Sequence, residues 1–493
     1  MKNYLLFVFA ILGYVQIQAQ NLTDVVRWSA IDQLGTARTL GAGSAFGAMG
    51  GDFSVVNINP AGIADYRVSE FTFTPSLRGY KTDAWFDKNS ANNQLSKGTG
   101  LSLDNIGFII ASNPGSKWTS SNIVLGFSRT ADLGRKVLIE GKIPGSIATY
   151  FAEKANGYTV DELDDFIAYP AYNTGAIYDA EKDKNYETDF GSADQLVDRT
   201  QEITQKGGIN ELTVGWAGEY NNQLNMGLSV GVPFGSFEEE KVYRESDEGD
   251  FIPVFNALKY TERLNTSGVG INFKAGFTYK ILNNIRIGGA FHSPTWYKFS
   301  DDYSTALQYT FTDHQGYQQY DYTSPDGTFE YKINTPWRAI GSAGYIYRIG
   351  DIKGFVNADF EYLDYTNASY NGTAYNSDAG EIEYTNEVNR TILKKLGTAT
   401  NVRLGTEFGY KNLRVRGGYS FEQSPYNADT HLNNKISFGL GFREDNFFID
   451  LGFRIAKNVE GYNPYVVLDS DLDPLANIKT TRTRSALTVG FKF

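Results

Sequence analysis

Apolar and polar residues alternate along most of the chain from about residue 68 onward. In the segment 402–408, Val402, Leu404 and Phe408 occupy one set of positions, and Arg403 and Glu407 occupy the positions between them. Successive side chains of a β-strand point to opposite faces of the sheet, so a period of two separates the two sets. The pattern predicts strands with one apolar face and one polar face.

Counting such segments gives fourteen predicted strands, an even number, as a closed antiparallel barrel requires. The strands cover roughly residues 68–79, 103–112, 121–130, 211–220, 224–234, 269–280, 285–297, 337–348, 353–365, 399–410, 413–423, 434–443, 447–457 and 484–493.

The connections between these strands alternate in length. Those after even-numbered strands have about two to eight residues, whereas those after odd-numbered strands have about ten to eighty. This alternation is typical of outer-membrane barrels, whose short turns lie in the periplasm and whose long loops lie outside the cell. A soluble β-sandwich, the alternative, has no reason to alternate its loops so strictly. The predicted fold class is therefore all-β, a fourteen-stranded antiparallel transmembrane β-barrel, formed by residues 68–493.

The first residues have the features of a secretory signal peptide. Lys2 supplies a positive charge, residues 5–15 form an apolar core, and Ala19 offers a small residue for cleavage. The core is too short to remain as a membrane anchor. We therefore expect residues 1–19 to be removed; an uncleaved helix at the membrane interface is the alternative.

Composition narrows the function classes. The chain has 51 Gly, 33 Tyr and 33 Phe, which suit strands and turns, and it contains no Cys. Its three histidines, His292, His314 and His431, show no metal-binding spacing, so no metal site is expected. A net charge of -12 argues against a nucleic-acid partner.

The last predicted strand ends in aromatic residues. Phe491 and Phe493 lie on its lipid-facing side, and such an ending is similar to the signal read by the outer-membrane barrel assembly machinery. We expect that machinery and the outer-membrane lipids to be partners of the chain. Other aromatic residues near strand ends predict an interfacial girdle: Trp296, Tyr297, Trp337 and Tyr426.

The longest predicted loop, residues 131–210, carries two helix patterns. Thr159 precedes an amphipathic stretch to Ile167, and Ser192 with Gln195 forms a capping-box pattern before a stretch closed by Gly207. A short amphipathic helix must bury its apolar face. Packing on the barrel rim and an apolar binding surface are both open.

Residues 20–67 lie between the signal peptide and the first strand, and they contain a Gly- and Ala-rich segment from Gly35 to Ala64. This composition favours a compact segment inside the barrel over a tail in the periplasm. The segment contains Asn59, Pro60, Ala61 and Gly62, and here the sequence resembles the FadL family of outer-membrane hydrophobic-compound transporters, whose plug, or hatch, carries an NPA motif. Supporting matches are NIGF at 105–108, RIGGAFHSP at 286–294, NTPWR at 334–338 and DFEYLDY at 359–365.

This resemblance implies a barrel plugged by an N-terminal hatch at residues 20–67. It also implies passive transport, without a cofactor, of hydrophobic small molecules such as long-chain fatty acids or aromatic hydrocarbons. In the family, the ligand lands on apolar loops, enters the lumen beside the hatch and leaves sideways through the wall.

The sequence departs from the family pattern in the number of charges that the predicted strands turn inward. They include Asn357, Asp359, Glu361, Arg403, Glu407, Arg414 and Arg416. These residues form either an ion-pair network that braces the barrel or a polar conduit that tunes selectivity. Neither role is catalytic.

Three other functions are alternatives to the transport of hydrophobic compounds. The first is a non-transporting FadL-like barrel that holds protein cargo or partners in a secretion system, as in the type IX system. The second is haem uptake, which would need an axial His, Met, Cys or Tyr. The third is an enzyme, which we do not expect, since adjacent His292 and Ser293 point to opposite faces of a strand.

Overall fold

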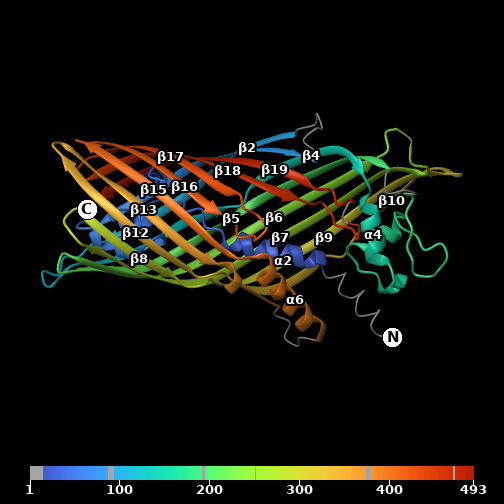
Figure 1. The fold of residues 1–493 in the computed structure, drawn as a ribbon, viewed down its shortest axis with the longest axis horizontal. Coiled ribbons are helices and arrows are strands. Elements are labelled where there is room, and N and C mark those ends of the chain that lie inside the picture. The colour runs from blue at the N-terminus through green and yellow to red at the C-terminus, as the bar shows by residue number, and fades with distance from the viewer. Residues whose placement is uncertain (1–14, 87–93, 191–194, 250, 373–378, 470–471) are drawn as a thin grey trace.

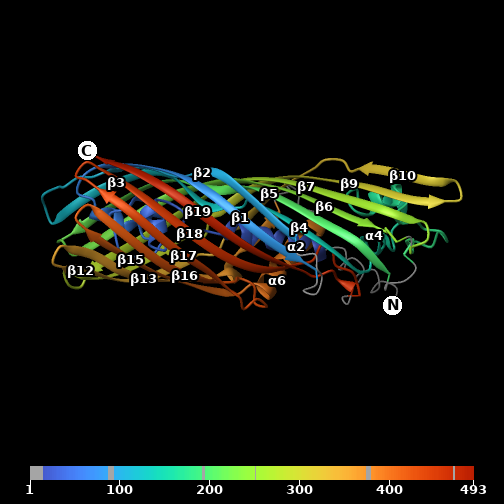
Figure 2. The same cartoon turned by 90° about the horizontal axis from the view of Figure 1, so that it is seen from above.

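The computed structural model describes every residue except 1–14, 87–93, 191–194, 250, 373–378 and 470–471 (Figure 1). Most of the predicted signal peptide therefore lies outside the described residues, and its cleavage stays a prediction. The described chain forms one long barrel with helices inside it and at one end (Figures 1 and 2).

The wall is a closed antiparallel barrel with fourteen strand positions. We call each position a stave, whether one strand or two successive strands fill it. Ten staves are single strands: β1 (Glu70–Trp85), β2 (Gln94–Ile110), β5 (Leu196–Tyr220), β6 (Leu224–Ser246), β7 (Phe255–Lys280), β15 (Thr398–Tyr410), β16 (Leu413–Gln423), β17 (Leu432–Arg443), β18 (Phe447–Tyr462) and β19 (Ala476–Lys492). Four staves are broken in two: β3 (Trp118–Asp132) with β4 (Arg135–Pro144), β8 (Ile285–His292) with β9 (Trp296–Asp313), β11 (Gly327–Asn334) with β12 (Arg338–Ile349), and β13 (Ile352–Asp364) with β14 (Ser369–Gly372). A further strand, β10 (Gly316–Thr323), pairs with the end of β9 as a hairpin.

The barrel closes where β1 pairs with both β2 and β19. Glu70 lies opposite Ile109 on one side and opposite Lys492 on the other. Large apolar side chains on the outward face are exposed, among them Leu212, Leu228, Phe273, Leu404, Phe408, Phe438 and Leu440. Such a belt suits contact with lipid tails. The predicted fold class and all fourteen predicted staves are confirmed.

The helices are short and lie in the lumen or at the end of the barrel that carries the long loops. They are α2 (Val15–Ser29), α3 (Ala37–Gly41), η1 (Phe53–Asn57), η2 (Pro60–Asp65), α4 (Ile147–Ala155), η3 (Val160–Glu162), α5 (Ala168–Asn173), η4 (Tyr365–Asn367) and α6 (Ala379–Lys395). No helix in the described ranges is long and apolar enough to cross a membrane.

Two expectations about loop 131–210 need correction. The predicted second helix was wrong, because residues 196–206 are the first half of β5; its predicted cap at Ser192 lies outside the described residues. Val197, Arg199, Gln201 and Ile203 are buried at alternate positions, so this segment follows a strand period and pairs with β6. The first predicted helix, up to Ile167, is only the single turn η3 with the Thr159–Glu162 capping box, and α5 begins after it at Ala168.

Several strands are also much longer than predicted, because the sheet continues past the apolar belt. β5, β6 and β7 have 25, 23 and 26 residues. Beyond the belt, the outward residues of these strands are polar. Alternation of apolar and polar residues therefore could not predict the extension. Helices α4 and α5 pack on the inner face of the extension, against Tyr243, Phe255 and Tyr260.

Candidate functional site

The hatch, which we define as residues 30–66, fills the lumen near the end with the short turns (Figure 1). Thr36 caps α3, and its hydroxyl also donates to the Asp52 carboxylate at 2.8 Å. Asp52 accepts further hydrogen bonds from the Thr39 hydroxyl and the Ser54 amide, at 2.8 and 2.9 Å. One buried carboxylate thus joins α3 to η1 and gives the hatch a fixed internal shape.

The predicted hatch motif forms a second joint of this kind. Asn59 caps η2: its Oδ1 accepts from the Ala61 amide at 3.2 Å, and Pro60 takes the first helical position, where no amide donor is needed. Its Nδ2 donates to the Gly47 carbonyl at 2.7 Å and to the Phe277 carbonyl of β7 at 3.0 Å. Asn59 therefore links the hatch segments around Gly47 and Ala61 to each other, and it links the hatch to β7 of the wall.

The wall makes room for this motif with glycines. A Cβ on Gly276 would lie 2.1 Å from Asn59 Oδ1, and a Cβ on Gly227 would lie 2.4 Å from the Pro60 carbonyl carbon. A Cβ on Gly62 would lie 2.9 Å from the Met49 carbonyl oxygen, which places the last motif residue at a close contact within the hatch. Hatch and wall are thus matched in shape at the motif.

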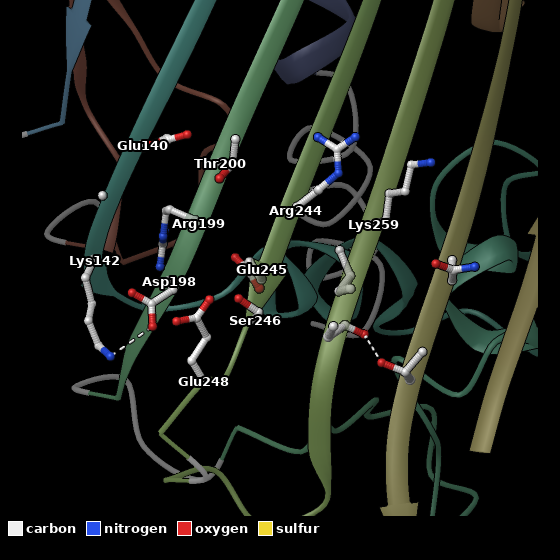
Figure 3. Close-up of a pocket in the computed structure, with 15 residues that line it drawn as sticks. Glu140, Lys142, Asp198, Arg199, Thr200, Arg244, Glu245, Ser246, Glu248 and Lys259 are labelled. Carbon is white, nitrogen blue, oxygen red and sulfur yellow. Dashed lines mark hydrogen bonds and ion pairs between the residues drawn. The ribbon is translucent and has the colours of Figure 1, made fainter. Parts of the chain in front are cut away.

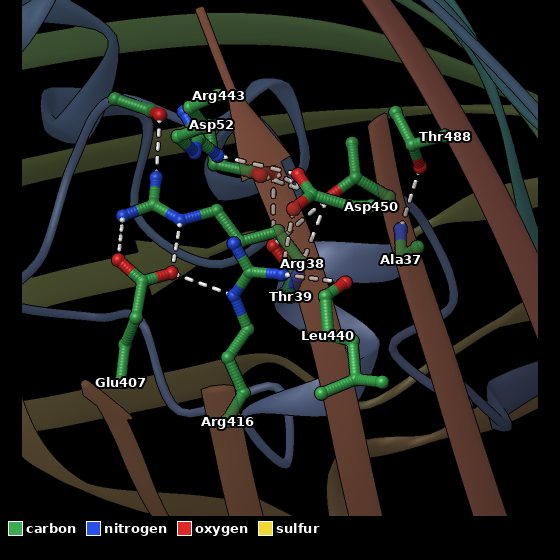
Figure 4. A network of polar contacts seen from close by, with 12 residues as sticks. Ala37, Arg38, Thr39, Asp52, Glu407, Arg416, Leu440, Arg443, Asp450 and Thr488 are labelled. Atoms are coloured by element: carbon green, nitrogen blue, oxygen red, sulfur yellow. Dashed lines mark hydrogen bonds and ion pairs between the residues drawn. The ribbon is translucent and has the colours of Figure 1, made fainter. Parts of the chain in front are cut away.

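Charged groups fix the opposite side of the hatch (Figure 4). Arg38 of α3 binds Glu407 of β15 through two contacts, Nε to Oε2 at 2.9 Å and Nη2 to Oε1 at 3.1 Å. Glu407 also accepts from Arg416 Nε at 2.6 Å, and Arg416 Nη1 pairs with Asp450 at 2.6 Å. A chain of ion pairs therefore runs from the hatch across β15, β16 and β18.

Other inward charges are likewise paired. Glu361 bridges Arg338 and Arg403, and Asp359 accepts from the Phe46 and Gly47 amides of the hatch at 2.9 and 3.0 Å. Six of the seven inward residues predicted from the sequence are thus joined to one another or to the hatch; the sixth, Asn357, donates to Asp359 at 2.7 Å. Arg414 is the exception, because it is half-buried beside a turn and donates to the Lys411 and Leu413 carbonyls. The sequence leaves open an ion-pair network that braces the barrel and a polar conduit, and these contacts support the ion-pair network.

Towards the end with the long loops, the lumen becomes aromatic. Tyr297, Phe299, Tyr331 and Tyr370 stack in series, with ring centroids 5.1, 5.4 and 5.3 Å apart. Trp28 of α2 lies on this stack, 4.5 Å from Phe299. We call these five residues the aromatic chamber. Helix α6 closes one side of the same apolar cluster with Val388 and Ile392.

Helix α2 places an acidic group beside this chamber. Asp24 is fully buried, and burial raises its pKa to about 7 despite its ion pair with Arg27. Its Oδ2 and the Trp28 Nε1 have no hydrogen-bond partner among the described residues. Burying polar atoms without partners costs free energy. The docking of α2 in the lumen therefore leaves two buried polar atoms without a hydrogen bond, which lowers its stability.

The hydrogen-bond ladder of the wall is interrupted between β2 and the β3–β4 stave. The β2–β3 pairs run only from Asn105 opposite Ser128 to Ile110 opposite Ile123. From Gln94 to Asp104, within the described part of the wall, β2 pairs only with β1, while β4 pairs with β5. At the far end, Gln94 Nε2 donates to Glu140 Oε2 at 2.6 Å. We call the interval bounded by these two contacts the wall gap. Unpaired backbone at membrane depth is tolerated where it lines a cavity.

A hollow of another kind lies outside the lumen. It measures about 520 Å³ and lies beyond the apolar belt, on the side of the extended sheet facing away from α4 and α5 (Figure 3). Charges of both signs line it, including Lys142 paired with Asp198 at 3.0 Å, and Arg244, Glu248 and Lys259. A hydrophobic compound has little to gain from such a lining.

The remaining residues singled out in the sequence are dispersed. Phe491 and Phe493 are exposed at the end of β19, and their role in assembly stays a prediction. His292 is buried against the hatch, with Nε2 3.0 Å from the Ile58 carbonyl, whereas His431 is exposed and bonds Asp429. Among the described residues, no group of three His, Cys, Asp or Glu could hold a metal ion.

The predicted aromatic girdle is half wrong. Trp296 is exposed, and Trp337 stacks on the exposed Phe291. Tyr297 and Tyr426, however, pack inside, against the cluster that contains Trp28. The break after Pro294 starts a new strand at Trp296, so the neighbouring Tyr297 faces the lumen.

Comparison with solved structures finds barrels that match almost the whole chain. The Pseudomonas putida toluene transporter TodX aligns over 94% of this chain and 99% of its own, with 11% sequence identity and a TM-score of 0.53. A Pseudomonas aeruginosa FadL homologue aligns over 94% and 100%, with 11% identity and a TM-score of 0.54. This is the FadL-type barrel fold.

The fold implied by the sequence resemblance is thus confirmed. No family model matches the chain, and no curated protein matches it either. At 11% identity, the similarity carries the FadL-type architecture and leaves the choice of substrate to this chain's own residues. The wall gap, the aromatic chamber and helices α2 and α6 escaped prediction, because each depends on contacts between residues far apart in sequence.

Proposed function

We propose that this protein passes hydrophobic small molecules across the bacterial outer membrane, passively and without a cofactor. The observation that carries the proposal is the combination of a fixed hatch with the wall gap. The hatch closes the direct path along the lumen, and its ion pairs and the Asn59 contacts oppose its removal. The wall gap provides the route from the lumen into the bilayer.

The route begins at the end with the long loops, which we assign to the cell exterior. An apolar molecule that enters there meets the aromatic chamber, whose stacked rings offer flat apolar surfaces. Trp28 and its helix occupy that chamber, and the unpartnered atoms of Asp24 and Trp28 favour their displacement. Long-chain fatty acids and aromatic hydrocarbons are the substrate classes that we propose. The structural neighbour TodX is described as a toluene transporter.

Native mass spectrometry of the protein released from detergent tests this proposal. We expect small apolar molecules to co-purify and to be displaced by added palmitate or toluene. A barrel that carries no such molecule and takes up neither probe would contradict it. Deletion of residues 35–64 provides the matched variant, in which we expect binding to be lost.

The polar hollow beyond the belt favours one alternative, a barrel that holds protein cargo or partners of a secretion system. Its charged lining and the long β5–β7 extension suit contact with a protein surface. The same mass spectra separate the two functions. A stoichiometric protein partner on a barrel without small molecules would favour the alternative.

A further inference from the structure

A second, much smaller cavity lies in the lumen beside the wall gap. It measures about 50 Å³, enough for a few water molecules or for one small anionic group. Its charged lining comes from three sides of the lumen: Arg78 of β1, Arg454 of β18, Arg482 and Arg484 of β19, Asp32 of the hatch and Asp132 at the end of β3. Four guanidinium groups therefore face two carboxylates.

The two carboxylates are already engaged. Asp132 pairs with Arg78 and with Arg484, whose Nη2 lies 2.9 Å from Oδ2. Asp32 pairs with Lys435 at 3.5 Å. Burial alone would raise the pKa of Asp32, but Lys435, Arg454, Arg482 and Arg484 outweigh burial and hold it well below its ordinary value. Arg484 also pairs with Asp104, so in the described part of the chain the two lining guanidinium groups without an ion-pair contact are those of Arg454 and Arg482.

Arg454 and Arg482 are the source of the excess charge. Arg454 donates to the Asp32 backbone carbonyl at 2.8 Å, and Arg482 donates to the Asp132 backbone carbonyl. Within the described ranges, no carboxylate oxygen lies within 4.0 Å of either guanidinium group. Arg454 is only 8% exposed. Burying these cations without a carboxylate in direct contact is costly, and a bound anion would offset that cost.

Two glycines, one on each side of the wall gap, lie against the Arg78 side chain. A Cβ on Gly100 would lie 2.8 Å from Arg78 Nε, and a Cβ on Gly134 would lie 2.8 Å from Arg78 Nη1. The absence of a side chain at both positions leaves room for Arg78 on its way to Asp132. On the lipid side of the same stretch, Leu101 is 83% exposed. At this point the single strand β2 separates the polar lumen from the apolar exterior of the barrel.

We propose that this cavity binds the oxyanion head group of an amphiphile whose alkyl chain extends through the wall gap into the bilayer. Guanidinium groups match carboxylate and phosphate oxygens in geometry and charge. The inference rests on the proposed lateral route, and it makes the gap selective for anionic amphiphiles over neutral compounds of the same chain length. The head group comes either from a single-chain carboxylate or from the phosphate of a membrane lipid.

Equilibrium binding of dodecanoate, dodecyl phosphate and dodecanol to the purified full-length barrel tests the inference. We expect at least one of the two anions to bind about tenfold or more tightly than dodecanol, which corresponds to about 1.4 kcal/mol. The tighter anion identifies the source of the head group. In the double variant Arg454→Gln/Arg482→Gln, this preference should disappear while dodecanol binding stays unchanged.

Arg414→Gln is the matched control, because Arg414 also donates only to backbone carbonyls but lies outside the cavity. Equal binding of all three compounds by the unaltered protein would overturn the inference and leave the proposed function standing. If the unaltered protein bound none of the three compounds, both the inference and the proposed function would be contradicted. Equal competition by acetate would overturn the requirement for an alkyl chain. These comparisons on the unaltered protein do not depend on whether the double variant folds.

Discussion

Arg38 of the hatch and Glu407 of the wall are joined by two parallel contacts of 2.9 and 3.1 Å, with both side chains largely buried. The same glutamate also holds Arg416. One carboxylate thus balances a hatch arginine and a wall arginine. Removing it leaves the buried Arg38 without its carboxylate partner and Arg416 with Asp450 alone, and breaking a buried pair in this way is strongly destabilising.

Replacing Glu407 with Gln should loosen the hatch without opening the barrel. We expect about 3 kcal/mol less protection of the amides in residues 37–52, seen as hydrogen exchange about two orders of magnitude faster. Glu240→Gln is the control, since its pair with Arg263 is exposed and contributes under about 1 kcal/mol. Unchanged exchange in Glu407→Gln would show that the pair does not hold the hatch.

Gly276→Ala should disturb the hatch by shape alone. The added Cβ would lie 2.1 Å from Asn59 Oδ1, so Asn59 must move and weaken its bonds to Gly47 and Phe277. Overpacking of this kind costs about 1–3 kcal/mol. Planar-bilayer recordings should show more frequent current openings than in the unaltered protein.

Gly341→Ala provides the matched comparison, because a Cβ there meets no atom within 4 Å. If both alanine variants gave the same closed recordings, the close fit of Asn59 to the wall would have no part in sealing the lumen.

Docking of α2 should depend on pH through Asp24. Its pKa is about 7 in the docked helix, against 3.8 when it is free; burial raises it, Arg27 and Lys241 lower it, and Asp301 and Glu239 raise it. The docked state therefore holds a proton that the released state loses. Docking should be strongest below about pH 4, weaken as pH rises through 7, and change little above that.

Hydrogen exchange of residues 22–29 across pH 4–8, corrected for the intrinsic rate, measures this dependence. In Asp24→Asn the contribution of this group should vanish and the profile should flatten. A stronger docking at pH 8 than at pH 5 in the unaltered protein would contradict the assignment.

Trp28→Ala should enlarge the ligand space of the aromatic chamber. The lost indole leaves an apolar void beside Tyr297 and Phe299, and dry apolar voids bind molecules such as benzene. We expect tighter binding of toluene by calorimetry than in the unaltered protein. Trp216→Ala, which removes a partly exposed outward ring, should leave toluene binding unchanged. A decrease in Trp28→Ala would mean that the indole itself is part of the binding surface.

The barrel could be predicted from the sequence because its wall obeys a local rule. Leu404 and Phe408 face lipid while Arg403 and Glu407 face the lumen, and this period of two is visible in one strand alone. The hatch motif was equally visible, since Asn59 and Pro60 act on their own neighbours.

The site itself depends on contacts that no local pattern records. Residues 196–206 contain an apolar series that suits a helix as well as a strand, and only pairing with β6 decides between them. The wall gap arises where a ladder stops at Asn105, and the small cavity beside it gathers arginines from β1, β18 and β19. Trp28 meets Phe299 across 270 residues of chain, because the hatch carries the N-terminal helix back into the lumen.

Initial uptake rates in a Gram-negative host that lacks its own hydrophobic-compound channel test the central claim most directly. With the protein in the outer membrane, labelled palmitate or toluene should enter severalfold faster than in cells without it, while a small sugar should enter no faster, because the hatch seals the lumen. Unchanged rates for both apolar probes, or a matching rise for the sugar, would contradict the account.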